Sequence, residues 1–374
     1  MPPKQILISA GESSGDMYAA RLAAELQKRL PVELFGMGGP RMREAGVELI
    51  ADSKEVAVVG ILEALSKIPK LLGIRNRIIT EAKRRKPAIA ILTDFPGFHV
   101  RLARKLKSAG IPAVYFICPQ FWAWRPWRAN LVRKRFVRGL CIFPFEEDWY
   151  RRRGVAVDFI GHPLVGEVRA TQTREEFAAA HGLDPARPIV ALLPGSRHSE
   201  LAQHMPVLLG ACPAIAQGWG AQFVLAVAPD VQPEDLARFL RPNVPVTLVA
   251  GATYDVVGAA DLAIVSSGTA TIETALLGTP MIVIYRLSAL SAALVRPMIR
   301  TPAIAMVNLI AGRRVVPELI QSEFTRERVA DEAGRLLDSP EAREQIRRDL
   351  ADVRARLGPP GAIARAADII AGML

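Results

Sequence analysis

The chain has 374 residues, half of them hydrophobic, and a formal net charge of +11 at pH 7. This length is typical of two domains with substantial cores, and the charge favours an anionic partner such as a nucleotide, a nucleic acid or a lipid headgroup. The chain contains no bilayer-length apolar run, no signal-peptide pattern and no metal-type or disulfide-type cysteine spacing, so the sequence predicts a cytoplasmic protein.

Strand-like and helix-like segments alternate along the first half. We expect helices near 18–30 and 100–109 and strands at 6–10, 33–35, 88–92, 113–117, 139–143 and 158–160. This alternation is typical of a parallel sheet with helices on both faces.

A second cycle begins after Gly161-His162-Pro163. It predicts a helix at 174–181, a helical end of the chain beyond 325, and strands at 189–193, 223–226, 246–249, 262–265 and 281–285. The fold class is therefore α/β, with two Rossmann-like domains facing a cleft. We expect the domains at 1–165 and 166–374, with terminal helices that pack back on the first domain. Ligands of such sheets bind at the carboxyl ends of the strands.

Two small-residue turns follow buried strands of the second half. Ser267-Gly268-Thr269 follows 262–265, and Gly195-Ser196-Arg197 follows 189–193. Unpaired N–H groups at a helix start bind anions, and an arginine fork matches a phosphate. Glu273, one helical turn further on, is placed to accept hydrogen bonds from a ribose. Each turn alone is also compatible with an ordinary cap or loop, but the pair favours a nucleotide-diphosphate pocket.

In the first half, the loop after the first strand contains five candidate acceptor-site residues. They are Gly11, Glu12, Ser13, Gly15 and Asp16. The glycines allow close approach of a ligand, whereas Asp16 could equally be a plain N-cap.

Asp94 ends a buried strand beside Phe95 and Phe98, which is a suitable place for a general base because burial raises the pKa of a carboxyl group. A loop-capping role for Asp94 and a rival base in His99 remain alternatives.

Two surface segments extend the candidate site. In 121–128, Trp124 and Arg125 are placed to wall a sugar and bind its phosphate, although packing alone also explains the tryptophans.

Segment 61–86 has eight basic residues against two acidic ones, with apolar residues at helical spacing. Such a helix can lie on a membrane or pack on a core with a solvated basic face. The expected membrane contacts are Leu65, Ile68, Leu71 and Leu72. Nucleic-acid binding is disfavoured, because its recognition motifs are missing.

Together these motifs resemble the lipid-A-disaccharide synthase family, in the family's order and over nearly the whole chain. The matching stretches are 10–16, 39–42, 122–125, 159–162, 193–197, 267–270 and 308–313. The resemblance implies a GT-B fold, a UDP-2,3-diacylglucosamine donor, a 2,3-diacylglucosamine 1-phosphate acceptor, self-association as a homodimer, and no metal or other cofactor. It further implies catalytic roles for Asp94 and Arg197 and a donor contact for Asn308. The chain departs from the family pattern at Gly97 and His99, where the family often has Asp and Asn.

The resulting hypothesis is an inverting sugar transfer that forms the β(1→6) lipid A disaccharide and UDP, in an enzyme associated peripherally with the inner membrane. In it Asp94 removes a proton from the acceptor hydroxyl, and Arg197 with the N–H groups near Gly268 stabilises the leaving diphosphate. A UDP-N-acetylglucosamine 2-epimerase on the same fold and a non-enzymatic binding module remain the alternatives.

Overall fold

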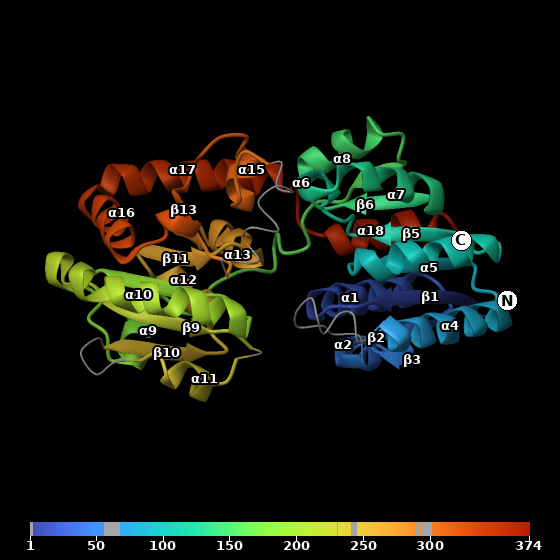
Figure 1. Ribbon diagram of the computed structural model, residues 1–374, viewed down its shortest axis with the longest axis horizontal. Coiled ribbons are helices and arrows are strands. Elements are labelled where there is room, and N and C mark those ends of the chain that lie inside the picture. Colours follow the sequence, from blue (N-terminus) through green and yellow to red (C-terminus); the bar gives the residue numbers. More distant parts are fainter. Residues whose placement is uncertain (1–2, 56–67, 230, 241–244, 289–291, 293–300) are drawn as a thin grey trace. The chain divides into compact units, whose positions relative to one another are not determined.

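The computed structural model describes residues 3–55, 68–229, 231–240, 245–288, 292 and 301–374 (Figure 1). The chain forms two compact units, Met1–Pro163 with Leu357–Leu374, and Leu164–Arg356. The last helix, α18 (Ala362–Ala371), therefore belongs to the first unit, where it packs against α1 (Ser13–Arg29). The sequence-based boundaries had assigned its residues to the second domain, with the expectation that the terminal helices pack back on the first.

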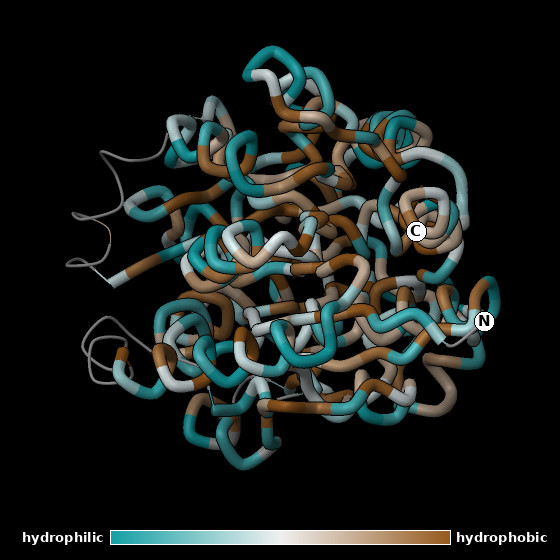
Figure 2. Tube along the Cα trace, turned by 90° about the vertical axis from the view of Figure 1, so that its right-hand side faces the viewer, coloured by the Kyte–Doolittle hydropathy of each residue, from teal (hydrophilic) through white to brown (hydrophobic). Residues whose placement is uncertain are grey.

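The first unit contains a sheet of seven parallel strands in the order β3-β2-β1-β4-β5-β6-β7. Its strands are β1 (Lys4–Ala10), β2 (Val32–Gly38), β3 (Glu48–Asp52), β4 (Ile89–Thr93), β5 (Ala113–Phe116), β6 (Arg138–Cys141) and β7 (Val157–Phe159). The central strands are continuous apolar runs, as expected for a parallel sheet covered on both faces, and Figure 2 shows such hydrophobic segments inside hydrophilic loops.

Helices cover this sheet in Figure 1. Besides α1 and α18 they are α2 (Pro40–Glu44), α4 (Ile68–Arg85), α5 (Pro96–Ser108), α6 (Phe121–Trp124), α7 (Ala129–Arg135) and α8 (Pro144–Arg151), with 3₁₀ turns η1 (Ser53–Glu55) and η2 (Pro126–Arg128). Because α1 begins at Ser13, earlier than expected, the 11–16 motif is a two-residue link after β1 followed by the first turn of a helix.

The second unit contains six parallel strands in the order β10-β9-β8-β11-β12-β13. They are β8 (Ile189–Leu193), β9 (Gln222–Val227), β10 (Val246–Ala250), β11 (Leu262–Ser266), β12 (Met281–Tyr285) and β13 (Glu318–Ile320). The helices are α9 (Arg174–His181), α10 (His198–Trp219), α11 (Pro233–Ala237), α12 (Thr253–Ala259), α13 (Thr269–Leu277), α15 (Met306–Ala311), α16 (Arg326–Asp338) and α17 (Pro340–Arg356), with the 3₁₀ turn η4 (Gln321–Glu323).

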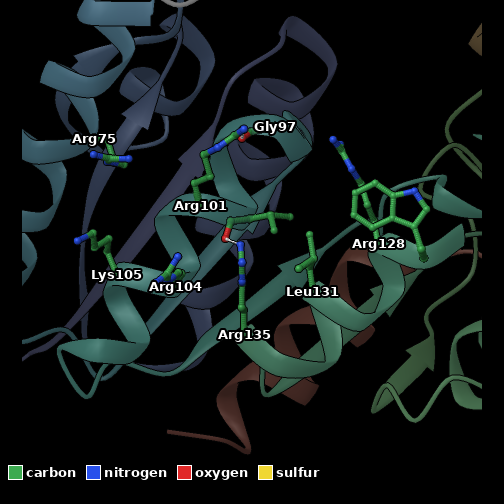
Figure 3. Close-up of a pocket in the computed structure, with 10 residues that line it drawn as sticks. Arg75, Gly97, Arg101, Arg104, Lys105, Arg128, Leu131 and Arg135 are labelled. Carbon is green, nitrogen blue, oxygen red and sulfur yellow. Dashed lines mark hydrogen bonds between the residues drawn. The ribbon is translucent and has the colours of Figure 1, made fainter. Parts of the chain in front are cut away.

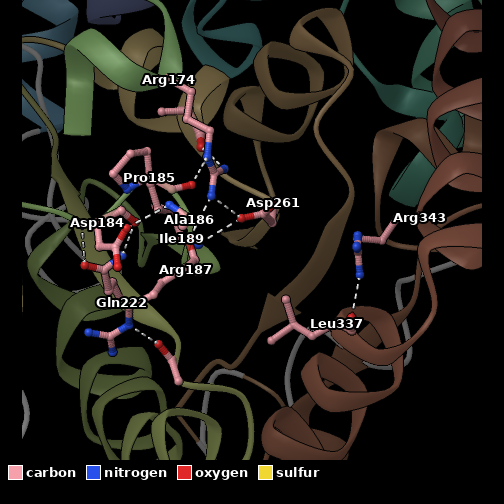
Figure 4. A network of polar contacts seen from close by, with 12 residues as sticks. Arg174, Asp184, Pro185, Ala186, Arg187, Ile189, Gln222, Asp261, Leu337 and Arg343 are labelled. Atoms are coloured by element: carbon pink, nitrogen blue, oxygen red, sulfur yellow. Dashed lines mark hydrogen bonds and ion pairs between the residues drawn. The ribbon is translucent and has the colours of Figure 1, made fainter. Parts of the chain in front are cut away.

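One arginine joins α9 to the starts of two central strands of the second unit (Figure 4). Arg174 donates to Asp261 Oδ2 at 2.8 Å, and the same oxygen accepts from the Ile189 N–H at 2.9 Å. Its guanidinium also donates to three backbone carbonyls, those of Pro185, Arg187 and Ala259. This network fixes the end of the sheet opposite to the small-residue turns.

The strand order places a switch point in each sheet. The chain runs outward from β1 to β3 and resumes on the other side of β1 at β4, and it does the same from β8 to β10 and then β11. Loops diverge at such points and leave a crevice at the carboxyl ends of the strands. The loops after β1, β4, β8 and β11 carry the candidate residues.

Candidate functional site

In the first unit, the switch point holds the carboxylate of Asp94. Asp94 Oδ1 accepts from the Gly11 N–H at 2.9 Å, and Oδ2 accepts from the Glu12 N–H at 3.1 Å. Both N–H groups lie at the start of α1, where an anion is stabilised by the helix dipole. The backbone of Asp94 and Phe95 is left-handed, with φ of 55° and 38°, so the loop is strained around the carboxylate.

Two glycines allow this close approach. A Cβ added at Gly15 would lie 1.5 Å from Asp94 Oδ2, and one added at Gly11 would lie 2.7 Å from the Phe95 ring. Any larger residue at Gly15 would therefore displace the carboxylate. The sequence had suggested that these glycines let a ligand approach the backbone. In the structure they make room for the side chains of Asp94 and Phe95 instead.

Burial is the main influence on the Asp94 carboxyl group. It raises the pKa of Asp94 to about 8, against the lowering effect of the Gly11 N–H, and the Glu12 charge raises it further. A carboxylate with this pKa holds a proton more tightly than a solvated one, so it is a stronger general base once it is deprotonated, which happens as the pH approaches 8.

Two buried side chains fix the backbone carbonyl of Asp94. His99 Nδ1 lies 3.0 Å from that oxygen, and the Tyr115 hydroxyl donates to it at 2.7 Å. Because a carbonyl only accepts, Nδ1 carries the proton, and Nε2 accepts from the Ser9 hydroxyl at 2.8 Å. Burial lowers the pKa of His99 to about 4, so the ring is neutral. With both nitrogens engaged, His99 positions Asp94, and this geometry favours Asp94 over the rival base.

Asp16 does not share this site. Its buried carboxylate accepts from the N–H groups of Gly39 (2.6 Å), Arg41 (3.1 Å) and Met42 (3.2 Å). It therefore caps the start of α2 and joins α1 to it, which is the structural alternative that the sequence had left open, although on a different helix. Glu12 and Ser13, in contrast, are exposed.

The aromatic segment divides into a structural part and an exposed part. Trp122 donates to Oε1 of the fully buried Glu146 at 2.9 Å, which fixes α6 to α8. Trp124 is 37% exposed, and the Arg125 guanidinium stacks 4.5 Å from its ring centroid. Trp124 and Arg125 thus form a surface pair that is open to a ligand.

In the second unit, a pocket of about 640 Å³ opens at the switch point between β8 and β11. It brings together seven residues expected to bind the donor, namely Gly195, Ser196, Arg197, Ser267, Gly268, Thr269 and Glu273. The volume is in the range of pockets that hold small ligands.

The first turn of this pocket already holds an anionic group of the chain. Glu200 Oε1 pairs with the Arg197 guanidinium at 3.1 Å, and Oε2 accepts from the Ser196 N–H at 3.2 Å. Gly195 has a φ of 114°, and a Cβ there would lie 2.4 Å from Glu200 Oε2. A carboxylate thus occupies a place suited to a phosphate oxygen, and the Arg197 side chain, 71% exposed, is accessible to a ligand.

The second turn starts α13 without a side-chain cap. Gly268 is the N-cap residue, and a Cβ at this position would meet nothing within 4 Å. One turn on, Glu273 Oε1 accepts from the Tyr254 hydroxyl at 3.1 Å. Burial raises the pKa of Glu273. The start of α13 and the Glu273 carboxylate therefore both line this pocket.

Asn308 lies outside this pocket. Its Nδ2 donates to Val316 O at 3.0 Å and to Glu318 Oε1 at 2.7 Å, while Oδ1 accepts from the N–H groups of Val315 (2.7 Å) and Val316 (3.0 Å). The residue is buried, and these bonds use its whole capacity. In place of the expected donor contact, the structure gives Asn308 a role in joining α15 to the segment that leads into β13.

Sequence reasoning missed His204, which holds the first turn. Its Nδ1 donates to the Pro194 carbonyl at 2.7 Å, and Nε2 accepts from the Arg286 N–H at 3.0 Å. Burial lowers the pKa of His204, which favours this neutral form. No local pattern signals this role, because His204 lies within α10 and both of its partners lie in other segments.

Solved structures with this architecture place the fold in a known class. The glycotransferase of kitacinnamycin matches with a TM-score of 0.66 at 16% identity, covering 100% of both chains. UDP-GlcNAc 2-epimerase from Neisseria meningitidis matches with a TM-score of 0.59 at 14% identity, covering 99% of both. With two parallel sheets and helices, the fold is the GT-B fold of glycosyltransferases.

Sequence similarity identifies the family within this class. Residues 6–367 match the family model described as lipid-A-disaccharide synthetase. A lipid-A-disaccharide synthase of Solibacter usitatus (strain Ellin6076) is 45% identical over 367 residues, which cover 97% of this chain and 96% of the relative. The chain belongs to the lipid-A-disaccharide synthase family and is a glycosyltransferase.

Proposed function

We propose that the enzyme transfers a 2,3-diacylglucosamine unit from UDP to the 6-hydroxyl of 2,3-diacylglucosamine 1-phosphate, with inversion at the anomeric carbon. The observation that carries the proposal is Asp94, a partly buried carboxylate held by two backbone N–H groups with its pKa raised to about 8. Family membership supports the formation of a lipid A disaccharide.

On the acceptor side, Asp94 accepts the proton of the 6-hydroxyl as that oxygen attacks. The new bond joins the acceptor oxygen to the anomeric carbon, and the bond from this carbon to the diphosphate breaks on the opposite face. The positions of His99 and Tyr115 behind the Asp94 carbonyl keep the loop in place during this transfer. Preorganisation of this kind lowers the barrier without a change in structure during the step.

On the donor side, the leaving diphosphate gathers negative charge in the pocket of the second unit. Arg197 and the N–H groups at the start of α13 are the groups that stabilise it, and Glu273 accepts from the ribose hydroxyls. Since Glu200 occupies the first turn, the diphosphate displaces its carboxylate or shares the Arg197 guanidinium with it. Trp124 and Arg125 contribute to the acceptor side.

The acyl chains of both substrates place the reaction at a membrane surface. The start of α4 presents Ile68 and Leu72, 45% and 43% exposed, whereas Leu71 packs partly against the core and Leu65 lies outside the described residues. We assign the membrane contact to Ile68 and Leu72, with the basic residues of α4 next to anionic headgroups. Peripheral association with the inner membrane and a homodimer complete the proposal. Across the part of the chain that the structure describes, no helix is both long and apolar enough to cross a bilayer.

The test is release of UDP from UDP-2,3-diacylglucosamine with and without the lipid monosaccharide phosphate, in buffer containing EDTA. We expect release that requires the acceptor, and a β(1→6) linkage in the isolated disaccharide. Acceptor-independent conversion of simple UDP-sugars would instead support an epimerase.

A further inference from the structure

A second cavity, in the first unit, has a strongly basic lining. It measures about 360 Å³. Its lining residues are Arg75, Gly97, Val100, Arg101, Arg104, Lys105, Trp127, Arg128, Leu131 and Arg135. The six charged ones are all basic and come from α4, α5, η2 and α7, as Figure 3 shows.

These charges are not neutralised by other described residues. Arg101 donates to the Gly97 carbonyl, and Arg135 Nη1 donates to the Val100 carbonyl at 2.9 Å, so both are bound to neutral carbonyl groups and neither has an ion pair among the described residues. The Nε atoms of Arg75 and Arg128 are buried and have no hydrogen-bond partner among the described residues. A buried unpaired donor costs free energy, which an anionic ligand would recover.

Burial and neighbouring positive charges together disfavour the charged form of two of these arginines. Burial and then the charges of Arg125 and Arg101 lower the pKa of Arg128. Burial and then the charges of Arg104 and Arg101 do the same for Arg135. A solvated basic helix face would spread its charges apart, whereas here separate elements bring them to one cavity.

The cavity is also amphiphilic. Val100 and Leu131 line it beside Trp127, whose side chain is 60% exposed. The Arg128 guanidinium lies 5.3 Å from the Trp127 ring centroid, so charge and aromatic surface are adjacent. This combination suits a phosphate that is attached to a sugar and an apolar chain.

The position of the cavity relates it to Asp94. Gly97, at its near end, lies three residues after Asp94 in the first turn of α5. With a helix rise of about 1.5 Å per residue, Arg101 is about 6 Å and Lys105 about 12 Å further along α5. The first basic residue of α5, Arg101, thus lies in the second turn of the helix that follows the proposed base in the chain.

We infer that this cavity binds a phosphate monoester, the one carried by the glycolipid acceptor, while its reacting hydroxyl faces Asp94. The inference rests on the proposed function and assigns the phosphate to Arg101, Arg104, Lys105 and Arg128, where the sequence had favoured Arg125. The phosphodiester of a bilayer lipid and free inorganic phosphate are also anions that accept hydrogen bonds from arginine and lysine, so the experiments distinguish them from the acceptor.

The test compares Arg104→Gln/Lys105→Gln with the control Lys83→Gln/Arg133→Gln. All four side chains are exposed and each pair removes two charges, but Lys83 and Arg133 lie outside the cavity. For the first variant we expect the KM of the phosphorylated acceptor to rise about tenfold or more, with the KM of the UDP-sugar unchanged. The control should match the wild type.

A second acceptor, which lacks the phosphate, tests whether the effect of the substitution depends on that phosphate. The wild type should use 2,3-diacylglucosamine poorly, and the cavity variant should use it equally poorly, because the missing contact is the same. Equal sensitivity of both acceptors to the substitution would overturn the assignment, as would an unchanged KM for the phosphorylated one.

A direct binding measurement tests this inference independently of the proposed function. Glucosamine 1-phosphate should change the tryptophan fluorescence of the wild type and not that of Arg104→Gln/Lys105→Gln, even if no transfer is observed. If the variant instead loses only its sedimentation with phosphatidylglycerol vesicles, the cavity binds bilayer lipid and the inference is wrong. Competition by inorganic phosphate against the acceptor would support it.

Discussion

At the scale of single residues, the Asp94 carboxylate is costly to the fold and useful to the proposed reaction. Its pKa is raised from 3.8 to about 8, chiefly by burial. The folded state therefore binds a proton that the unfolded state has already released between these values, so stability falls as pH rises from about 4 to about 8. Asp94→Asn removes this dependence, and urea unfolding at several pH values should show a smaller decline than in the wild type.

The same pKa predicts a rate profile. Because the base must be deprotonated, kcat/KM should rise about tenfold per pH unit below pH 8 and level off above it. A profile that is flat from about pH 6 to pH 9 would mean that Asp94 is not the titrating base.

Gly15 is the residue whose size matters most to this carboxylate. Gly15→Ala places a Cβ 1.5 Å from Asp94 Oδ2, so the turnover should fall about a hundredfold while UDP still binds. Gly73→Ala is the matched control, because a Cβ at this exposed position of α4 meets no described atom within 4 Å, and this change should be neutral or slightly stabilising. Equal activity of the two variants would contradict the proposed geometry.

At the scale of elements, each unit holds its strand-end turn with a buried neutral histidine, His99 in the first and His204 in the second. The opposite end of the second sheet is held by Arg174 (Figure 4). The positions of the strand-end turns therefore depend on contacts between elements that are distant in the sequence.

Arg174→Leu should lower the free energy of unfolding of the second unit by about 2–3 kcal/mol, because it leaves Asp261 and three carbonyls without their shared donor. Arg335→Leu breaks only an exposed pair with Glu332 within one helix and should cost less than about 0.5 kcal/mol. Urea unfolding compares the two, and similar losses would remove the special role of Arg174.

The sequence predicted the elements that local patterns define and missed those that depend on contacts between distant segments. Continuous apolar runs predicted β8 and β12 to the residue, and the capping-box spacing before Arg174 agrees with the predicted helix 174–181. The early start of α1 was missed, because Ser13 to Gly15 are typical of a loop. β13 was missed because it is short and begins with Glu318, whose burial depends on partners at 304, 305 and 308.

The same distinction between local patterns and contacts between distant segments applies to the candidate functional site. Turns next to strands were predicted from local spacing, as with Gly195 and Gly268. The Asn308 network depends on bonds between segments and was not visible in the sequence, whereas a capping role for Asp16 was foreseen but not the helix that it caps. The basic cavity was missed entirely, since Arg75, Arg101 and Arg135 meet only after folding.

At the scale of the whole molecule, the net charge of +11 agrees with anionic substrates at an anionic surface. Ile68→Asp/Leu72→Asp should reduce flotation with vesicles containing phosphatidylglycerol several-fold and leave the unfolding transition unchanged, because both side chains are exposed. Ile74→Asp is the contrasting change, since it buries a charge in the core and should unfold the first unit. Undiminished flotation of the double variant would exclude α4 as the membrane contact.

The central claim is that Asp94 is the base of an acceptor-dependent sugar transfer. Its most direct test is UDP release from UDP-2,3-diacylglucosamine in the presence of the acceptor by Asp94→Asn, together with UDP binding by the same variant. The account predicts that release falls by about two to four orders of magnitude while UDP binds as in the wild type. Release at the wild-type rate would contradict it and give Asp94 a structural role.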